Sequence, residues 1–331
     1  MTLTKGGHMR VHNFLLAIAV GFVTVAQAQT VRVDGSSTVF PITEGIAEDY
    51  QKATKTKVTV GVSGTGGGFK KFCRGEIDVQ NASRPISESE IQACKQTGIE
   101  FLELPVAFDA LTVVIHPKNT WAKTMTVAQL KRIWEPAAQG KVTHWNQINP
   151  AWPNAPLKLF GAGTDSGTFD YFTEAIVGRS KASRGDFTAS EDDNVLVLGV
   201  SRDVNSLGYF GFAYYAEHKD KLQSVSIVNA SGQPTPPSET SVMDGTYNPL
   251  SRPIFIYVSV KSLDRPEVRR FVEFYMANAP KISREVKYVP LPDSVYKNNL
   301  KIVADRRVGT IFGGHNVVGM TVEQMINKQV K

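Results

Sequence analysis

The sequence of 331 residues predicts an α/β protein of two lobes, with mixed, mostly parallel sheets and helices on both faces. Two observations support this. Short β-branched runs alternate with helical patterns over the first part of the chain, which is typical of parallel α/β units. The chain also leaves the first unit near Ala110 and returns to it near Pro253, so two strands would cross between the units and form a hinge.

The first unit is read from its hydrophobic periodicity. Ile42, Ile46 and Tyr50 recur at helical spacing, and Ser87 and Glu90 form the S-x-x-E pattern that caps a helix start. Strands are predicted at residues 31–33, 57–62, 75–82, 101–105 and 110–115, and helices at 41–54, 69–73 and 88–96.

The second unit begins after Pro117. Thr126 starts a helix that places Leu130, Ile133 and Trp134 on one face. Further helices are predicted at residues 169–177, 192–200, 213–219, 265–279 and 294–305, and strands at 157–161, 224–229 and 254–260. The predicted domains are residues 29–110 with 253–331 as one lobe and residues 111–252 as the other.

The N-terminus has the pattern of a secretory signal peptide, residues 1–28. Arg10 and His12 precede an apolar run at residues 14–25, which ends in a small-x-small site at Ala26-Gln27-Ala28. The run is shorter than the ~20 apolar residues that a transmembrane helix needs. We therefore expect cleavage after Ala28 and export to the periplasm.

The cysteines and charges narrow the class of protein. Cys73 and Cys94 are an even pair in an exported chain, which favours one disulfide. A metal site is the weaker interpretation, because no histidine lies near either cysteine in the sequence. The net charge is +6, from which a leader carrying Lys5 and Arg10 would remove two positive charges. Basic runs are no longer than two residues, so nucleic-acid binding has little support and a monomer without cofactors is expected.

Three turns rich in glycine and hydroxyl residues lie between a predicted strand and a helix. They are Asp34-Gly35-Ser36-Ser37-Thr38, Ser63-Gly64-Thr65-Gly66-Gly67-Gly68 and Gly163-Thr164-Asp165-Ser166-Gly167-Thr168. The unpaired N–H groups and the dipole of a helix N-terminus favour a small anion. Any one turn is explained by ordinary N-capping, but three of them together indicate one oxyanion held by several helix starts.

These turns resemble those of the phosphate-binding proteins of Pst-type ABC transporters, which have the type II periplasmic-binding-protein fold. The resemblance runs from about Val31 to Ala304. It is carried by DGSSTVFP at 34–41, SGTGGGFKKF at 63–72, NASRPI at 81–86, FDALTVVIHP at 108–117, GTDSGTFDYF at 163–172 and NSLGYFGFAYY at 205–215. It implies two lobes that close on a dehydrated phosphate and deliver it to an inner-membrane ABC permease.

The resemblance also implies which residues bind the anion. Hydroxyl or N–H groups would come from Ser37, Thr38, Val39, Ser63, Thr65, Ser166, Gly167 and Thr168. Well-studied members carry aspartate at the place of Arg84 and arginine just before the third turn, where this chain has glycine and alanine. We therefore expect Arg84 to supply the positive charge and Asp165 to accept the proton of phosphate, which sulfate lacks.

Each of these two assignments has an alternative. Arg84 would otherwise pair with Asp78 or Glu88 and brace its lobe, and Asp165 would otherwise cap the helix that follows.

The sequence supports other functions less well than phosphate binding. An enzyme has little support, because the D-S-G at Asp165 occurs once, no G-x-S-x-G elbow or P-loop is present, and no histidine lies near the turns in sequence. A receptor for sulfate or molybdate, or an exported scaffold or adhesion protein of the same fold, remains an alternative.

Overall fold

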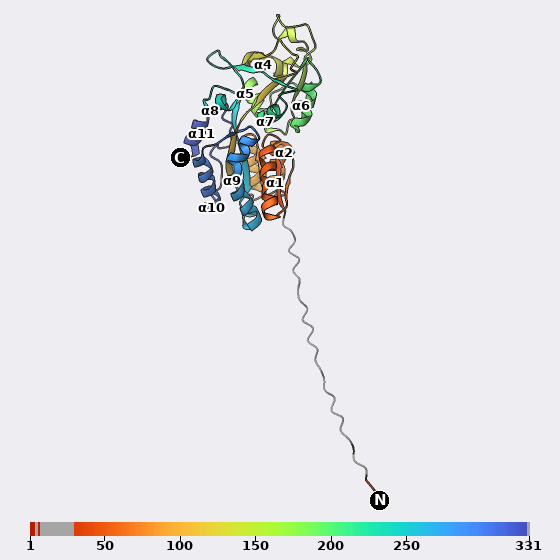
Figure 1. Cartoon of the computed structure of the whole chain (residues 1–331), viewed down its shortest axis with the longest axis vertical. Coiled ribbons are helices and arrows are strands. Elements are labelled where there is room, and N and C mark those ends of the chain that lie inside the picture. Colours follow the sequence, from red (N-terminus) through yellow and green to blue (C-terminus); the bar gives the residue numbers. More distant parts are fainter. Residues whose placement is uncertain (4–5, 7–29, 330–331) are drawn as a thin grey trace.

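The computed structural model describes residues 1–3, 6 and 30–329. Most of the predicted signal peptide and its cleavage site therefore lie outside the described residues. The folded part begins at β1 (Val31–Gly35) and ends with α11 (Val322–Gln329), which is labelled in Figure 1 and which the sequence patterns did not predict. Among the helices of the described ranges, none is long and apolar enough to cross a membrane.

The larger sheet has six strands in the order β14-β4-β13-β3-β1-β2. Its strands β1, β2 and β3 pair in parallel, whereas β13 runs antiparallel to both of its neighbours. The strands after β1 are β2 (Val58–Val60), β3 (Val79–Ala82), β4 (Phe101–Ala110), β13 (Ser251–Ser259) and β14 (Val289–Pro290). The helices of this part are α1 (Phe40–Thr54), α2 (Gly64–Phe72), α3 (Glu88–Gln96), α9 (Pro266–Glu285) and α10 (Asp293–Asp305).

The second sheet has five strands in the order β10-β5-β9-β7-β8, again with parallel and antiparallel pairs. They are β5 (Thr112–Ile115), β7 (Lys158–Ala162), β8 (Thr188–Ser190), β9 (Ser206–Phe210) and β10 (Gln223–Ser224). A small third sheet joins β6 (Thr124–Thr126), β11 (Ser226–Val228) and β12 (Pro234–Thr235). The accompanying helices are α4 (Val127–Trp134), α5 (Gly167–Val177), α6 (Asp193–Ser201), α7 (Phe212–Glu217) and α8 (Glu239–Met243).

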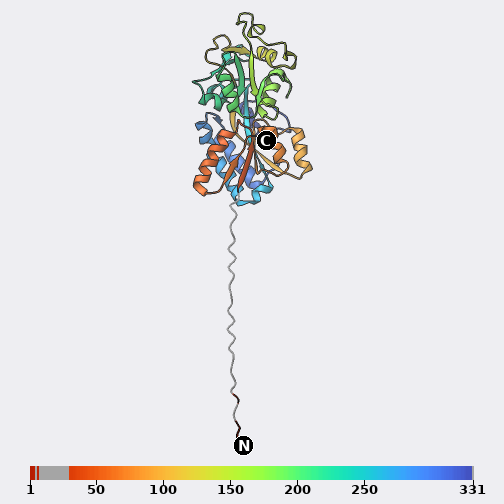
Figure 2. The ribbon, with the colours of Figure 1, turned by 90° about the vertical axis from the view of Figure 1, so that its right-hand side faces the viewer.

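The chain passes between the two larger sheets at two places. β4 and β5 are separated only by Leu111, and β13 begins directly after Leu250, whose carbonyl accepts from the N–H of Leu111. Figure 2 shows the two bodies one above the other, with the green and yellow segments in one and the red, orange and blue segments in the other. The α/β class with mixed sheets is confirmed, and the precise limits of the lobes stay a prediction.

Local sequence explains where several helices begin. Ser87 and Glu90 form the predicted capping box of α3, and Thr126 forms a second one with Gln129 at the start of α4. Helix α2 starts at Gly64, earlier than its apolar residues suggested. Its glycines allow a close approach, since a Cβ on Gly68 would lie 2.0 Å from the Gln80 Oε1.

The predicted disulfide is present. Cys73, at the end of α2, is bonded to Cys94 in α3, and both residues are buried in the core of the six-stranded sheet. The bond fixes the two helices that follow the second turn and the NASRPI segment. It therefore holds one side of the candidate site to the core.

Candidate functional site

The first and third glycine-hydroxyl turns meet directly. The Thr38 hydroxyl, at the start of α1, lies 3.0 Å from the Thr168 hydroxyl in the first turn of α5. Both side chains are fully buried, although the residues are 130 positions apart. Each turn follows a parallel strand, β1 or β7, of a different sheet, so the two sheets bring their strand ends to a common point.

The second turn reaches the same point through Thr65. Its hydroxyl lies 3.3 Å from the Ser83 hydroxyl and accepts a hydrogen bond from the Ser83 N–H. A Cβ on Gly167 would lie 2.5 Å from the Thr65 Oγ1 and 2.7 Å from the Ser83 Oγ. Glycine at position 167 is therefore what allows the start of α5 to approach these hydroxyls.

The positive charge at this meeting point is Arg252, the second residue of β13. Its side chain is fully buried, and its Nη2 donates to the hydroxyls of Thr168 at 2.9 Å and Thr38 at 3.3 Å. Its Nη1 donates to the carbonyls of Ser83 at 3.1 Å and Gly167 at 3.5 Å. One guanidinium thus touches the first and third turns and the segment after β3.

Asp109 fixes the orientation of Arg252. Its Oδ2 accepts from Nη2 at 2.8 Å and from Nε at 3.1 Å, and its Oδ1 accepts from the Phe212 N–H at 2.9 Å. Burial raises the pKa of Asp109, while the charge of Arg252 lowers it. Both side chains are completely inaccessible, so the pair must be satisfied locally, which the carbonyls and hydroxyls around Arg252 accomplish.

Other residues expected at the site have local roles in the turns. The Ser63 hydroxyl donates to Asp34 at 2.7 Å, and the Ser166 hydroxyl caps α5 by accepting from the Thr168 N–H at 3.1 Å. Val39 is the N-cap residue of α1 and is fully buried. The Ser37 carbonyl accepts from the Tyr214 hydroxyl at 2.9 Å.

A second buried carboxyl faces the first turn. Asp193, the first residue of α6, is fully buried, and burial raises its pKa to about 7. The Ser37 hydroxyl and the Gly211 N–H act on it in the opposite direction. The first turn therefore lies between a permanent cation, Arg252, and a carboxyl that can change its charge near neutral pH.

Arg84 lies in a different cluster from the one expected. Its Nε donates to Asp170 Oδ2 at 2.6 Å, and its two Nη atoms donate to the Glu90 carboxylate at 2.8 Å each. These partners differ from Asp78 and Glu88, the alternatives that the sequence suggested. Arg84 and Asp170 line a polar cavity of about 450 Å³, and their ion pair joins the segment after β3 to α5.

Asp165 also makes a different contact from the one expected. Its carboxylate is partly exposed and pairs with Lys70 of α2 at 2.8 Å, while its carbonyl accepts from the Gly66 N–H at 2.7 Å. Its own N–H donates to Glu191 at 3.0 Å. Asp165 thus joins the second and third turns through its carbonyl, and its carboxylate pairs with Lys70.

Sequence reasoning missed Arg252, Asp109 and Ser83, which the structure places beside the predicted threonines. One signal was available in the sequence. Asp109 and Arg252 are charged residues near the ends of mostly apolar strands, β4 and β13, at the positions where the chain crosses between the sheets. The register places Arg252 opposite Asp109 in the β4–β13 pair, which no single-strand pattern reveals.

Known proteins are similar in sequence to most of this chain. A family model described as a PBP superfamily domain matches residues 23–279. Protein SphX of Synechococcus elongatus is 52% identical over 92% of this chain and 90% of its own length. The phosphate-binding protein PstS of Staphylococcus saprophyticus is 37% identical over 80% of this chain and 82% of its own length.

A solved structure agrees with these relatives. A possible phosphate-binding protein from Planctomyces limnophilus has 47% sequence identity and a TM-score of 0.61, covering 84% of this chain and 99% of the other. The family model therefore covers more than half of the chain, and these relatives cover 80% or more of it. The chain belongs to the PBP superfamily and, within it, to the PstS-like periplasmic phosphate-binding proteins.

Proposed function

We propose that this chain binds inorganic phosphate where its three glycine-hydroxyl turns meet and delivers the anion to an ABC permease. The proposal rests on the family and on one observation of the structure. Arg252, a fully buried cation, contacts threonine hydroxyls from turns of both large sheets. A tetrahedral oxyanion needs several donors from different directions together with a compensating charge, and this arrangement supplies both.

The hydroxyls are the donors that would contact the anion. Thr38, Thr65, Ser83 and Thr168 bond to one another or to nearby backbone groups in the closed structure. An anion would replace the direct Thr38–Thr168 bond with two bonds of its own. Phosphate binding therefore requires the sheets to separate and close again, which the crossings at Leu111 and Leu250 permit.

The expected residues divide into two groups in this proposal. Thr38, Val39, Thr65, Gly167 and Thr168 stay in the binding site, together with the supporting residues Ser37, Ser63 and Ser166, and Arg252 supplies the charge. Arg84 and Asp165 instead hold the lobes together, through Asp170 and Lys70 respectively. These two ion pairs would form when the lobes close and break when they open.

The biological setting follows the family. We propose export through the predicted signal peptide, cleavage after Ala28 and action in the periplasm as a monomeric receptor. No reaction is assigned to the chain, because the groups gathered at the turns are donors and a fixed ion pair rather than a nucleophile with its base. The chain would then hand phosphate to the permease without changing it.

Calorimetric titration tests this function. The mature protein, stripped of bound anion, should bind phosphate one to one and tightly, and should release no heat with sulfate. Binding of sulfate or molybdate in preference to phosphate would replace the substrate while keeping the site. Absence of heat with every oxyanion would reject the receptor function and favour a scaffold or adhesion protein.

A further inference from the structure

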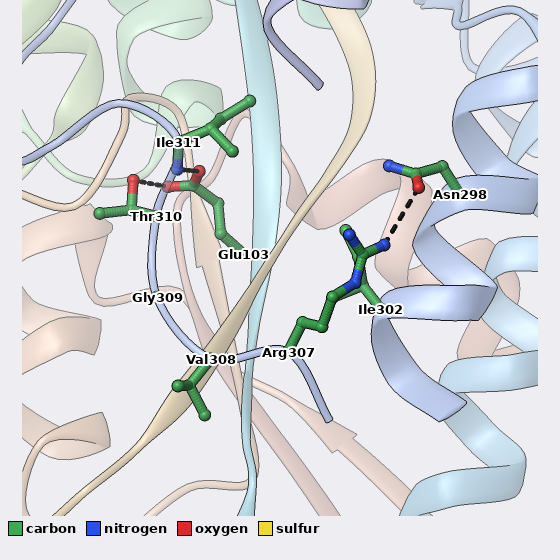
Figure 3. A pocket seen from close by; sticks show the side chains of 8 residues that line it. All are labelled: Glu103, Asn298, Ile302, Arg307, Val308, Gly309, Thr310 and Ile311. Atoms are coloured by element: carbon green, nitrogen blue, oxygen red, sulfur yellow. Dashed lines mark hydrogen bonds between the residues drawn. The ribbon is translucent and has the colours of Figure 1, made fainter. Parts of the chain in front are cut away.

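The C-terminal strap, residues 308–321, connects the two bodies of the protein a third time. It leaves α10 and first joins the edge of β4, where the Gly309 N–H donates to the Phe101 carbonyl at 2.9 Å. The Thr310 hydroxyl and the Ile311 N–H then donate to the Glu103 carboxylate at 2.5 Å and 3.0 Å, as Figure 3 shows. The strap is thus anchored on the six-stranded sheet.

The middle of the strap passes from the body of the six-stranded sheet to helix α5 of the other body. Phe312 is buried against Phe255 of β13, with ring centroids 5.3 Å apart, and Gly314 lies against Glu88 of α3. Two residues later, the Asn316 Nδ2 donates to Glu174 of α5 at 2.6 Å. Gly314 and Asn316 also line the cavity that contains the Arg84–Asp170 pair, so the strap covers that ion pair between the two bodies.

The end of the strap is fixed to the helix that carries the third turn. The Gly319 N–H donates to the Tyr171 hydroxyl at 2.9 Å, and the Gly319 carbonyl accepts from the Asn248 side chain at 2.9 Å. The same tyrosine hydroxyl donates to the carbonyl of Ser251, the first residue of β13, at 2.7 Å and to that of Pro249, two residues earlier, at 3.1 Å. Tyr171 therefore joins α5, the strap and the strand that carries Arg252.

We propose that Asn316, Glu174 and Tyr171 are positioning residues for phosphate binding, through which the strap favours the closed arrangement of the two lobes. Opening the cleft separates α5 from α3. Asn316 is hydrogen-bonded to α5, whereas Gly314 packs against α3. The strap contacts must then break or stretch. A connection that is complete only in the closed state raises the fraction of closed protein and so raises the apparent affinity for the ligand.

This inference rests on the proposed phosphate-binding function and adds a part of the chain that lies outside the turns. The matched family model ends at residue 279, before the strap begins. The strap residues bond neither the hydroxyls of the turns nor Arg252 directly; Tyr171, to which the strap is bonded, has its ring centroid 5.5 Å from the guanidinium carbon of Arg252. The effect of the strap should therefore appear in affinity and release rate and leave the choice of anion unchanged.

The test compares Asn316→Ala with Asn298→Ala in the mature chain. Asn298 is an asparagine of α10 that accepts from the Arg307 guanidinium at 3.1 Å, before the strap begins, and serves as the control (Figure 3). Loss of this one part-buried hydrogen bond, if it contributes no more than a typical one, predicts phosphate binding ~3–10-fold weaker in Asn316→Ala, with faster release in stopped-flow mixing. The control should bind as the wild type does.

Two further measurements separate positioning from general stability. The melting temperature without phosphate should be nearly unchanged in Asn316→Ala, and Glu174→Gln, which keeps an acceptor oxygen, should retain most of the affinity. A chain ending at Arg307 should bind more weakly than Asn316→Ala, with a larger radius of gyration at equal phosphate saturation. The inference would be overturned if Asn316→Ala and the chain ending at Arg307 both kept the affinity and release rate of the wild type. It would also be overturned if Asn298→Ala lost as much affinity as Asn316→Ala. Wild-type protein that binds no phosphate would reject the proposed function instead.

Discussion

Replacing Arg252 is the sharpest test of the binding site. The guanidinium is fully buried and touches hydroxyls of the first and third turns, so its loss removes the charge and the donors at the meeting point. Truncating one partner of a buried, hydrogen-bonded charge pair costs ~2–5 kcal/mol. For phosphate this predicts binding weaker by a factor of ~30–5000.

The design must separate binding from folding. Arg252→Met alone would leave Asp109 charged and unpaired in a fully buried position, which costs ~3–5 kcal/mol of stability. The double variant Arg252→Met/Asp109→Asn removes both charges and keeps an acceptor oxygen for the Phe212 N–H. This variant should fold and show the loss of affinity.

The assay is calorimetric titration with phosphate, preceded by circular dichroism to show that each variant is folded. Arg184→Met is the matched control, since Arg184 is also buried and paired with a carboxylate, that of Asp186, but bonds carbonyls in the α4 region. Arg252→Lys keeps the charge without the planar fork and should lie between the wild type and the double variant. A folded double variant that binds phosphate within ~3-fold of the wild type would refute the assignment of Arg252.

Three further predictions concern stability and packing. Burial raises the pKa of Glu103 to about 7, so the native state keeps a proton that the unfolded chain has released. The free energy of unfolding in urea should therefore fall by ~1–3 kcal/mol as the pH rises from 5 to 8. The fall should be smaller in Glu103→Gln. A stability that rises over this range would contradict the argument. Gly167→Ala should weaken phosphate binding at least ~10-fold, because its Cβ would lie 2.5 Å from the Thr65 hydroxyl oxygen, and an unaltered titration would show that the turns meet differently. Replacing both Cys73 and Cys94 by alanine should lower the unfolding free energy by ~2–4 kcal/mol while leaving phosphate affinity nearly intact, whereas equal stability with and without the bond would show that it does not constrain the unfolded chain.

The local signals of the sequence were sufficient for much of the fold. Helix starts with a capping box, such as Ser87 with Glu90, depend on residues three positions apart, and the structure has them where the sequence predicts. The disulfide between Cys73 and Cys94 followed from an exported chain with a single pair of cysteines. The sequence was less informative about α2 and α11, because glycine-rich and mixed polar segments become helical through tertiary contacts rather than propensity.

The same distinction between local and tertiary interactions applies to the residues of the candidate site. The turns that carry Thr38, Thr65 and Thr168 could be found from sequence, because a hydroxyl or glycine at a strand-to-helix turn is a local requirement of the backbone. The partner of each charge could not be found in this way. Arg84 lies two residues after the end of β3 and was expected to face the anion, yet in the structure it pairs with two carboxylates, those of Glu90 and Asp170.

Only the tertiary structure could assign the central cation. The sequence by itself determined the α/β class and predicted export and the oxyanion chemistry of the turns, since these depend on composition and on neighbours along the chain. The pairing of Asp109 with Arg252, 143 positions apart, depends on the register of β4 against β13 and on the burial of both charges. Electrostatic energies in a buried site are set by distances through space, and those distances exist only once β4 has paired with β13 and the two sheets have packed together.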